Sequence, residues 1–567
     1  MRLPNLLATR RGRLVAFFFL YVTEGIPLGF AATAIATQLR RQDVGPAEIG
    51  AFVASFYLPW AFKWAFGPVI DVFSSERLGR RRGWILGTQL MLILTLLACT
   101  TIQLPAQLGL LTAVLLIHNS FGAMQDVAID ALAVTTLHPD ERGLANGMMF
   151  GGAAIGQGIG GSGVLFLMPV LGVAGGFVFV AACIALVTVF IVLPLQEPAT
   201  PLADRREGGL GAAVAAMKAF SAEAFRSFLG TRGAYVGMLF SLLPAGAMGL
   251  GLALQSNLAV EVGMSDDSVA WLALWTQVIS AVFMVVGGQL SDRWGRRRTL
   301  GVYLSLMSLP ALYMMGVLLD HQWVMPVPQN AAEGARRVAP AALVTAVWVA
   351  TLTYSVAQGL MYGTRSALLM DVTNPKVAAT QFTAYMAMMN LVISYSAAWQ
   401  GIAIETLGYP KTLLIDAITG LLCVALLPWI KPSTVNEDGH GAARARRTAW
   451  VLAIGCLAWL PYRSGLFSAG AAAPMFETLF TLVFVAAAVF LATGSMVLGA
   501  AAGRLGRLGL WLAPLLLAMY LRKWWPQAGA LYLLVPALAA GVLLAQARQA
   551  WSGLKGAGAV PATAALA

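Results

Sequence analysis

The residues best suited to chemistry are ionisable and polar side chains inside long apolar runs. Asn119, Gly122, Asp126 and Asp130 are spaced by three, four and four residues, which places them on one face of an α-helix. Low-dielectric surroundings penalise the charged form of a carboxyl group, and a carboxylate inside a membrane is usually functional. Two such groups one turn apart also repel each other, so one of them is expected to hold a proton. The pattern predicts a proton-binding site at Asp126 and Asp130.

Two further charges lie in apolar runs nearer the N-terminus. Lys63 is about 12 Å deep when counted along a helix, which matches the depth of Asp130 and predicts a pair between them. Glu24 precedes Gly25 and Pro27, which would loosen its helix. These four charges are assigned to proton coupling; the alternative is a static structural pair.

A second polar stripe occurs later in the chain. Tyr354, Gln358, Tyr362 and Arg365 follow spacings of four, four and three residues, again one helical face. Arg365 could bind a carboxylate or phosphate of a substrate, pair with Asp126, or anchor the helix end through Asp371. The candidate substrate-binding residues are Asn119, Gln125, Tyr354, Gln358, Tyr362, Arg365, Asn390 and Gln400.

A charged loop motif occurs twice in the sequence. In each copy a Gly-x-x-x-Asp segment between apolar runs is followed by Gly-Arg-Arg-Arg. Pairs between these charges could form in one conformation and break in another, which makes a latch. The alternative is that the arginines only anchor the loops in the cytoplasm. The latch residues are Gly67, Asp71, Arg80, Arg81, Arg82, Gly288, Asp292, Arg293 and Arg296.

The amino-acid composition indicates whether the elements that carry these residues lie in water or in a membrane. Of 567 residues, 59% are hydrophobic and 11% are charged, and the mean hydropathy is +0.76. A soluble domain of this size could not bury so much apolar surface, so the chain is predicted to be an all-α membrane protein. The first apolar run has no cleavage pattern and is interpreted as a retained span.

The apolar runs predict two similar halves and a C-terminal extension. Two six-helix bundles are followed by two to four extra helices, giving 14 to 16 spans. The predicted divisions are 1–195 for the first bundle, 196–232 for a cytoplasmic linker with an amphipathic helix on the membrane surface, 233–430 for the second bundle, 431–448 for a second linker, 449–550 for the additional helices and 551–567 for a flexible tail. A repeat of this kind favours alternating access.

The distribution of the net charge of +12 along the chain indicates the orientation of the protein in the membrane. Lysines and arginines concentrate in alternate loops, which places both termini in the cytoplasm and gives no indication of a nucleic-acid partner. The cysteines lie in apolar segments without paired spacing, so neither a disulfide nor a metal site is expected. No cofactor is indicated. The run from Gly156 to Gly161 fits G-x-G-x-x-G but lacks a preceding strand, so close helix packing explains it better.

The second loop copy, from Gly288 to Arg297, resembles the signature loop of the major facilitator superfamily. The longer first copy resembles that of the AmpG-type branch, the peptide–acetyl-CoA transporter family. Further segments similar to this branch are Phe62-Lys63, Gln125-Asp126-Val-Ala-Ile-Asp130, Asp140-Glu141-Arg142-Gly143 and Ala379-Thr380-Gln381-Phe382. The resemblance implies a major facilitator fold with a cavity lined by spans 1, 4, 7 and 10.

The sequence therefore predicts a proton-coupled secondary transporter of the inner membrane, acting as a monomer in the lipid bilayer. It is expected to import a muropeptide-like solute. A siderophore or an acyl-CoA-like anion is the alternative substrate. A membrane-embedded acyltransferase-like enzyme using His118 and Asn119 is the alternative class, and it is disfavoured because the other histidines lie in loops.

Overall fold

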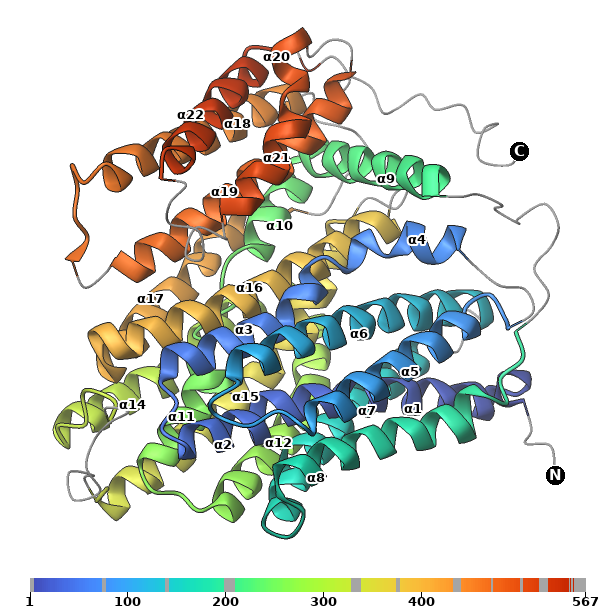
Figure 1. The fold of residues 1–567 in the computed structure, drawn as a ribbon, viewed down its shortest axis with the longest axis vertical. Coiled ribbons are helices and arrows are strands. Elements are labelled where there is room, and N and C mark those ends of the chain that lie inside the picture. The colour runs from blue at the N-terminus through green and yellow to red at the C-terminus, as the bar shows by residue number, and fades with distance from the viewer. Residues whose placement is uncertain are drawn as a thin grey trace. The chain divides into compact units, whose positions relative to one another are not determined.

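A computed structural model describes residues 5–73, 78–137, 142–197, 210–327, 338–373, 378–431, 440–470, 473–499, 503–519, 529–549, 551 and 554. These residues form helices and turns with no β-strand among them, which confirms the all-α class (Figure 1). Within them, nine segments are long and apolar enough to cross a membrane. Asp140 and Glu141, and most of the predicted tail at 551–567, lie outside the described residues.

Several predicted spans are divided into shorter helices. Each division occurs where glycine, proline or a change of helix type interrupts the regular hydrogen-bond pattern. The helices of the first half are α1 (Arg10–Gly29), α2 (Ala36–Arg41), α3 (Pro46–Ala61), α4 (Gly67–Val72), α5 (Arg82–Cys99), α6 (Leu108–Thr136), α7 (Arg142–Gly158) and α8 (Val164–Val187). Those of the second half are α10 (Arg232–Ser241), α11 (Ala253–Glu261), α12 (Asp266–Trp294), α13 (Arg296–Leu306), α14 (Ser308–Asp320), α15 (Ala341–Asp371), α16 (Ala378–Leu407) and α17 (Tyr409–Leu426).

The remaining helices belong to the linker and the C-terminal extension. They are α9 (Leu210–Gly230), α18 (Gly441–Arg463), α19 (Ala473–Leu498), α20 (Gly503–Arg507), α21 (Gly509–Ala518) and α22 (Leu531–Ala547). The chain divides into two compact units. The first contains residues 1–214, 241–367 and 386–425, and the second contains 215–240, 368–385 and 426–567. The domain boundaries predicted from the sequence stay predictions.

Helices α1 and α7 lie side by side in the first unit (Figure 1). Glycines on both helices let the backbones touch, because a Cβ on Gly25 would lie 2.0 Å from Ala153 O and one on Gly156 would lie 2.4 Å from Val22 O. The glycine run that mimics a nucleotide-binding motif therefore serves close helix packing, as the sequence predicted. This contact fixes the helix that carries Tyr21 and Glu24.

The second unit has a core of its own. Trp459 of α18 packs against Phe480 and Phe484 of α19, and its Nε1 donates to Tyr532 O at 2.6 Å. Helix α9 joins this core, since Phe225 stacks on Trp551 with ring centroids 5.7 Å apart. Protein therefore covers part of the apolar face of α9, which the sequence assigned to the membrane surface.

Candidate functional site

Two ionisable pairs form where α1, α6 and the short 3₁₀ turn after α3 meet. Lys63 Nζ lies 2.8 Å from Asp126 Oδ2, and the Tyr21 hydroxyl donates to Asp130 Oδ1 at 2.6 Å. The sequence predicted that Lys63 pairs with Asp130. That prediction is wrong for the direct contact, which Lys63 makes with Asp126. The helical count of depth failed because α3 ends at Ala61 and Lys63 begins a short 3₁₀ turn, which changes both rise and direction.

Glu24 is the third carboxylate of this group. It interacts electrostatically with Asp126, Asp130 and Lys63, and its Oε1 is buried without a hydrogen-bond partner among the described residues. One ammonium therefore faces three carboxylates, which we call the acidic cluster: Glu24, Asp126, Asp130 and Lys63. Like charges at short range in a low dielectric cannot all remain ionised. An excess of buried carboxylates over cations is the arrangement that a proton-binding site needs, and proton coupling stays a prediction.

The predicted polar residues of α6 are used in contacts between helices. Gln125 donates to Thr23 Oγ1 at 2.9 Å, and Asn119 donates to Phe56 O at 2.9 Å. His118 lies within hydrogen-bond distance of Thr95, 2.8 Å from its hydroxyl, and is fully buried. The structure therefore gives His118 and Asn119 separate partners. A role for Asn119 and Gln125 in substrate binding stays a prediction.

The polar stripe of α15 divides into buried and accessible members. Tyr354 is buried, and Gln358 donates to its hydroxyl at 3.4 Å. Tyr362 is 42% exposed, and Tyr57 of α3 lies near it in the opposite half. Arg365 is buried with Tyr362 and Tyr395 beside it. Tyr362 and Tyr57 thus bring α15 close to α3 of the first half.

Two candidates lie on α16. Asn390 is half-buried, whereas Gln400 is buried and donates to Asp416 Oδ1 at 2.8 Å. Asp416 was not among the site residues predicted from the sequence, although a lone carboxylate in the apolar run 409–430 is a signal of function by itself.

The duplicated loops share one backbone feature. Gly79 has φ +87° and Gly295 has φ +88°, a region that glycine enters without strain. Each glycine directly precedes an arginine of the motif. In the first copy, the backbone N–H groups of Arg81 and Arg82 donate to Glu197.

Other latch residues bind within their own halves. The Arg82 guanidinium donates to Leu193 O at 2.6 Å, and that of Arg296 to Ala367 O at 3.4 Å. Gly67 begins α4, Gly288 lies inside α12, and Arg293 is exposed. Arg80 is half-buried, and the side chains of Asp71 and Asp292 lie outside the described part of the chain. The latch stays a prediction.

Ion pairs join the halves at the opposite ends of the spans. Arg40 binds Glu261, and Arg41 binds Asp266 and also donates to Met264 O at 2.6 Å. Arg40 and Glu261 have side-chain exposures of 3% and 2%, so this pair is shielded from water. We call these four side chains the inter-half ion pairs. None of these four residues was predicted as a site residue, although their signal is visible in the sequence: two arginines end one apolar run, and Glu261 and Asp266 flank the loop after another.

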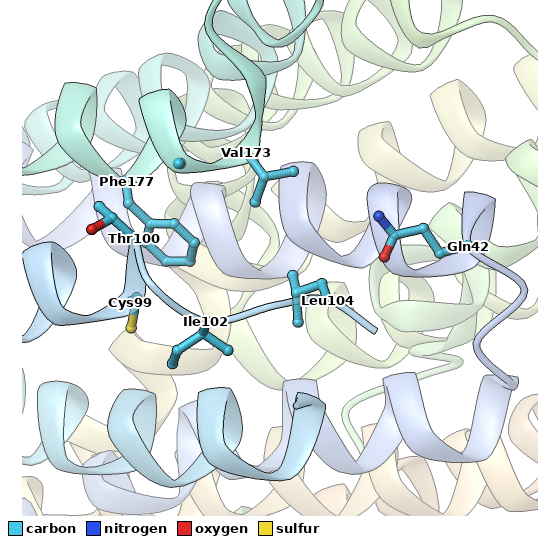
Figure 2. Close-up of a pocket in the computed structure, with 8 residues that line it drawn as sticks. Gln42, Cys99, Thr100, Ile102, Leu104, Val173 and Phe177 are labelled. Atoms are coloured by element: carbon cyan, nitrogen blue, oxygen red, sulfur yellow. The ribbon is translucent and has the colours of Figure 1, made fainter. Parts of the chain in front are cut away.

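Residues of the first half line a small pocket, which no member of the acidic cluster borders (Figure 2). It encloses about 120 Å³ and is lined by Gln42, Cys99, Thr100, Ile102, Leu104, Val173, Ala174 and Phe177. No predicted site residue borders it. Its volume suits a few water molecules rather than a solute of the predicted size.

Comparisons with known proteins decide the family. A sequence profile of the Major Facilitator Superfamily matches residues 14–256 and 238–567. The chain belongs to the major facilitator superfamily. Within it, the chain is similar to the anhydromuropeptide permease of Escherichia coli strain K12, with 22% identity over 77% of this chain and 84% of that protein. It is also similar to "Putative transporter AmpG 4" of Rickettsia conorii, with 20% identity over 74% and 96% of the two chains.

Solved structures support the same fold for this superfamily member. The xylose transporter XylE from E. coli in an inward open conformation superposes with a TM-score of 0.54 at 13% identity, covering 75% of this chain and 97% of that one. A POT family transporter in complex with 5-aminolevulinic acid gives 0.53 at 12%, covering 74% and 95%. The superfamily match makes the protein a multi-pass membrane transporter, and its sequence relatives are transporters, which argues against the enzyme alternative.

Proposed function

We propose that this protein is a proton-coupled importer that works by alternating access. The observation that carries the proposal is the acidic cluster, in which Lys63 alone faces Glu24, Asp126 and Asp130 within the described residues. Proton uptake would relieve the excess negative charge, and proton release would restore it. A change of charge inside a low-dielectric bundle alters the relative energies of two packings, which couples the proton to the conformation.

The proposed substrate is a muropeptide-like solute, an anhydro-sugar with a short peptide. The similarity to the anhydromuropeptide permease supports this class. Accessible Tyr362 with neighbouring Arg365 could stack on a sugar ring and bind a peptide carboxylate. A siderophore or an acyl-CoA-like anion would use the same arginine.

We place the protein in the inner membrane with both termini in the cytoplasm. The distribution of basic residues supports this orientation. It puts the inter-half ion pairs on the extracytoplasmic side and the duplicated loops on the cytoplasmic side. The ion pairs would then hold the outer ends of the halves together while the substrate leaves inward.

Uptake into proteoliposomes tests the proposal. Transport of muropeptide, siderophore and acetyl-CoA is measured with and without an imposed pH gradient. We expect muropeptide uptake that depends on the gradient and falls at least tenfold in Asp126→Asn, because the site loses its exchangeable charge. Ser120→Ala on the same helix is the matched control, since among the residues that the structure describes the Ser120 hydroxyl bonds only to Leu116 O of its own helix. Uptake that ignores the gradient, or is unchanged in Asp126→Asn, would exclude proton coupling.

A further inference from the structure

The seventh span is broken in the middle. Helix α10 ends at Ser241, and regular structure resumes with a short 3₁₀ turn at Gly249. Pro244 lacks an N–H group and Gly246 has φ +74°, so a continuous helix cannot form across this segment. Broken backbone inside a membrane must be satisfied by other parts of the protein. We call residues 242–248 the break.

Side chains from two neighbouring helices satisfy the two ends of the break. The Tyr395 hydroxyl of α16 donates to Leu242 O at 2.8 Å, and Asp416 Oδ2 of α17 accepts from Gly249 N at 2.8 Å. The backbone N–H of Met248 also interacts with Asp416. An acceptor with full charge suits these donors, because charge-assisted hydrogen bonds are the stronger kind.

Among the described residues, the side-chain hydrogen bonds of Asp416 are those with the break and with Gln400. Asp416 is 1% exposed, and no described lysine or arginine forms a salt bridge with it. Its Oδ1 accepts from Gln400, so both oxygens are used. Its own helix packs directly on the break, because a Cβ on Gly420 would lie 2.2 Å from Gly246 C.

The backbone just beyond the break touches the predicted substrate residues. A Cβ on Gly251 would lie 2.9 Å from the Tyr354 hydroxyl and 3.0 Å from Gln358 Nε2. Residues 249–251 therefore form the surface against which Tyr354 and Gln358 rest. The position of that surface depends on what holds Gly249.

We propose that Asp416 is a positioning residue, which fixes the broken seventh span and through it the placement of Tyr354 and Gln358 for substrate binding. The link to the substrate rests on the proposed function, whereas the link to the break does not. Gln400 then orients Asp416 and does not contact the substrate.

Hydrogen exchange of the purified protein in nanodiscs tests the link to the break without any substrate. We expect Asp416→Ala to speed amide exchange in residues 246–252 at least tenfold, with exchange in α6 unchanged. Asp416→Asn should stay within threefold of wild type, because the asparagine Oδ1 can still accept from Gly249. Gln400 can turn its Oε1, which has no hydrogen-bond partner among the described residues, toward the new amide. Thr412→Val on the same helix is the control, since within the described part of the chain the Thr412 hydroxyl bonds only to Gly408 O.

Transport kinetics test the second link. We expect Asp416→Ala to raise KM about tenfold and lower kcat less than threefold, because a misplaced Tyr354 and Gln358 weaken binding. General loss of structure would instead lower the maximal rate without raising KM.

Unchanged exchange at 246–252 in Asp416→Ala overturns the proposal. Fast exchange with an unchanged KM would overturn its second half alone, and absence of muropeptide transport in the wild type would overturn only the proposed function. If Asp416→Ala does not fold, exchange in Asp416→Asn as fast as in unfolded peptide would equally reject the hydrogen-bond account.

Discussion

Lys63 is the only cation of the acidic cluster within the described residues, and its side chain is 13% exposed. A buried ion pair gains little net stability, but removing one partner is costly because the other charge stays buried and uncompensated. In this cluster the lysine faces an excess of carboxylates, so its removal is worse than the loss of one pair. Removing Lys63 would leave Glu24, Asp126 and Asp130 without a cation of the cluster among the described residues.

A double-mutant cycle can measure this dependence. Lys63→Met should destabilise the protein by about 3–5 kcal/mol, because Asp126 loses its counter-ion. Lys63→Met with Asp126→Asn should recover most of that loss. Thermal unfolding in nanodiscs gives both values. Simple additivity of the two single changes would show that the ion pair does not couple these residues.

The packing of α1 against α7 is the element on which the acidic cluster depends. Adjacent glycines of α7 differ sharply in their surroundings. A Cβ on Gly152 would lie 2.2 Å from Phe18 O, whereas one on Gly151 would meet nothing within 4 Å. The helix therefore has one face that excludes any side chain and another that accepts it, and this positions Tyr21 and Glu24 toward α6.

Alanine at these two glycines makes a matched pair. Gly152→Ala should destabilise the protein by about 1–3 kcal/mol, since the methyl group must force α1 and α7 apart. Gly151→Ala should be neutral or stabilising by about 0.5–1 kcal/mol, because alanine favours the helix. Thermal unfolding measures both. Equal effects of the two changes would contradict the close contact.

The inter-half ion pairs act on the whole molecule. Glu261 lies at the end of α11, just beyond the predicted span 233–260, where burial raises its pKa above the ordinary value of 4.5 although Arg40 opposes the shift. When the halves separate, Glu261 meets water and its pKa returns toward that value. The joined state thus binds a proton more tightly than the separated state. Its population should rise as pH falls through the raised pKa and fall as pH rises.

Labelling of a cysteine placed at Val44 can follow this equilibrium. Val44 is 4% exposed beside Arg40, whose guanidinium donates to Val44 O. In a background without the native cysteines, Val44→Cys should react more slowly at pH 5 than at pH 7. Val338→Cys, at a position 94% exposed, corrects for the chemistry of the thiol. Glu261→Gln should remove the residual pH dependence. A pH dependence that persists in Glu261→Gln would assign the effect to another group.

The class of the molecule could be predicted from local patterns in the sequence, because periodicity and the length of apolar runs depend only on neighbouring residues. The one-face spacing of Asp126 and Asp130, the glycine packing of the fifth span and the superfamily resemblance of the duplicated loop all required only neighbouring residues. The predicted all-α fold and the predicted superfamily agree with the comparisons.

Only the tertiary structure decided which charges meet. Lys63 contacts Asp126 because a 3₁₀ turn, invisible to a straight-helix count, redirects the second span. Asp416 contacts the break because α17 packs against a span much earlier in the chain; Asp416 is 167 residues from Gly249. Arg40 and Glu261 meet across the two halves for the same reason. Contacts between distant segments depend on where helices break and on how closely glycines let helices approach. The spacing of residues along the sequence gives neither the position of a break nor the distance between packed helices.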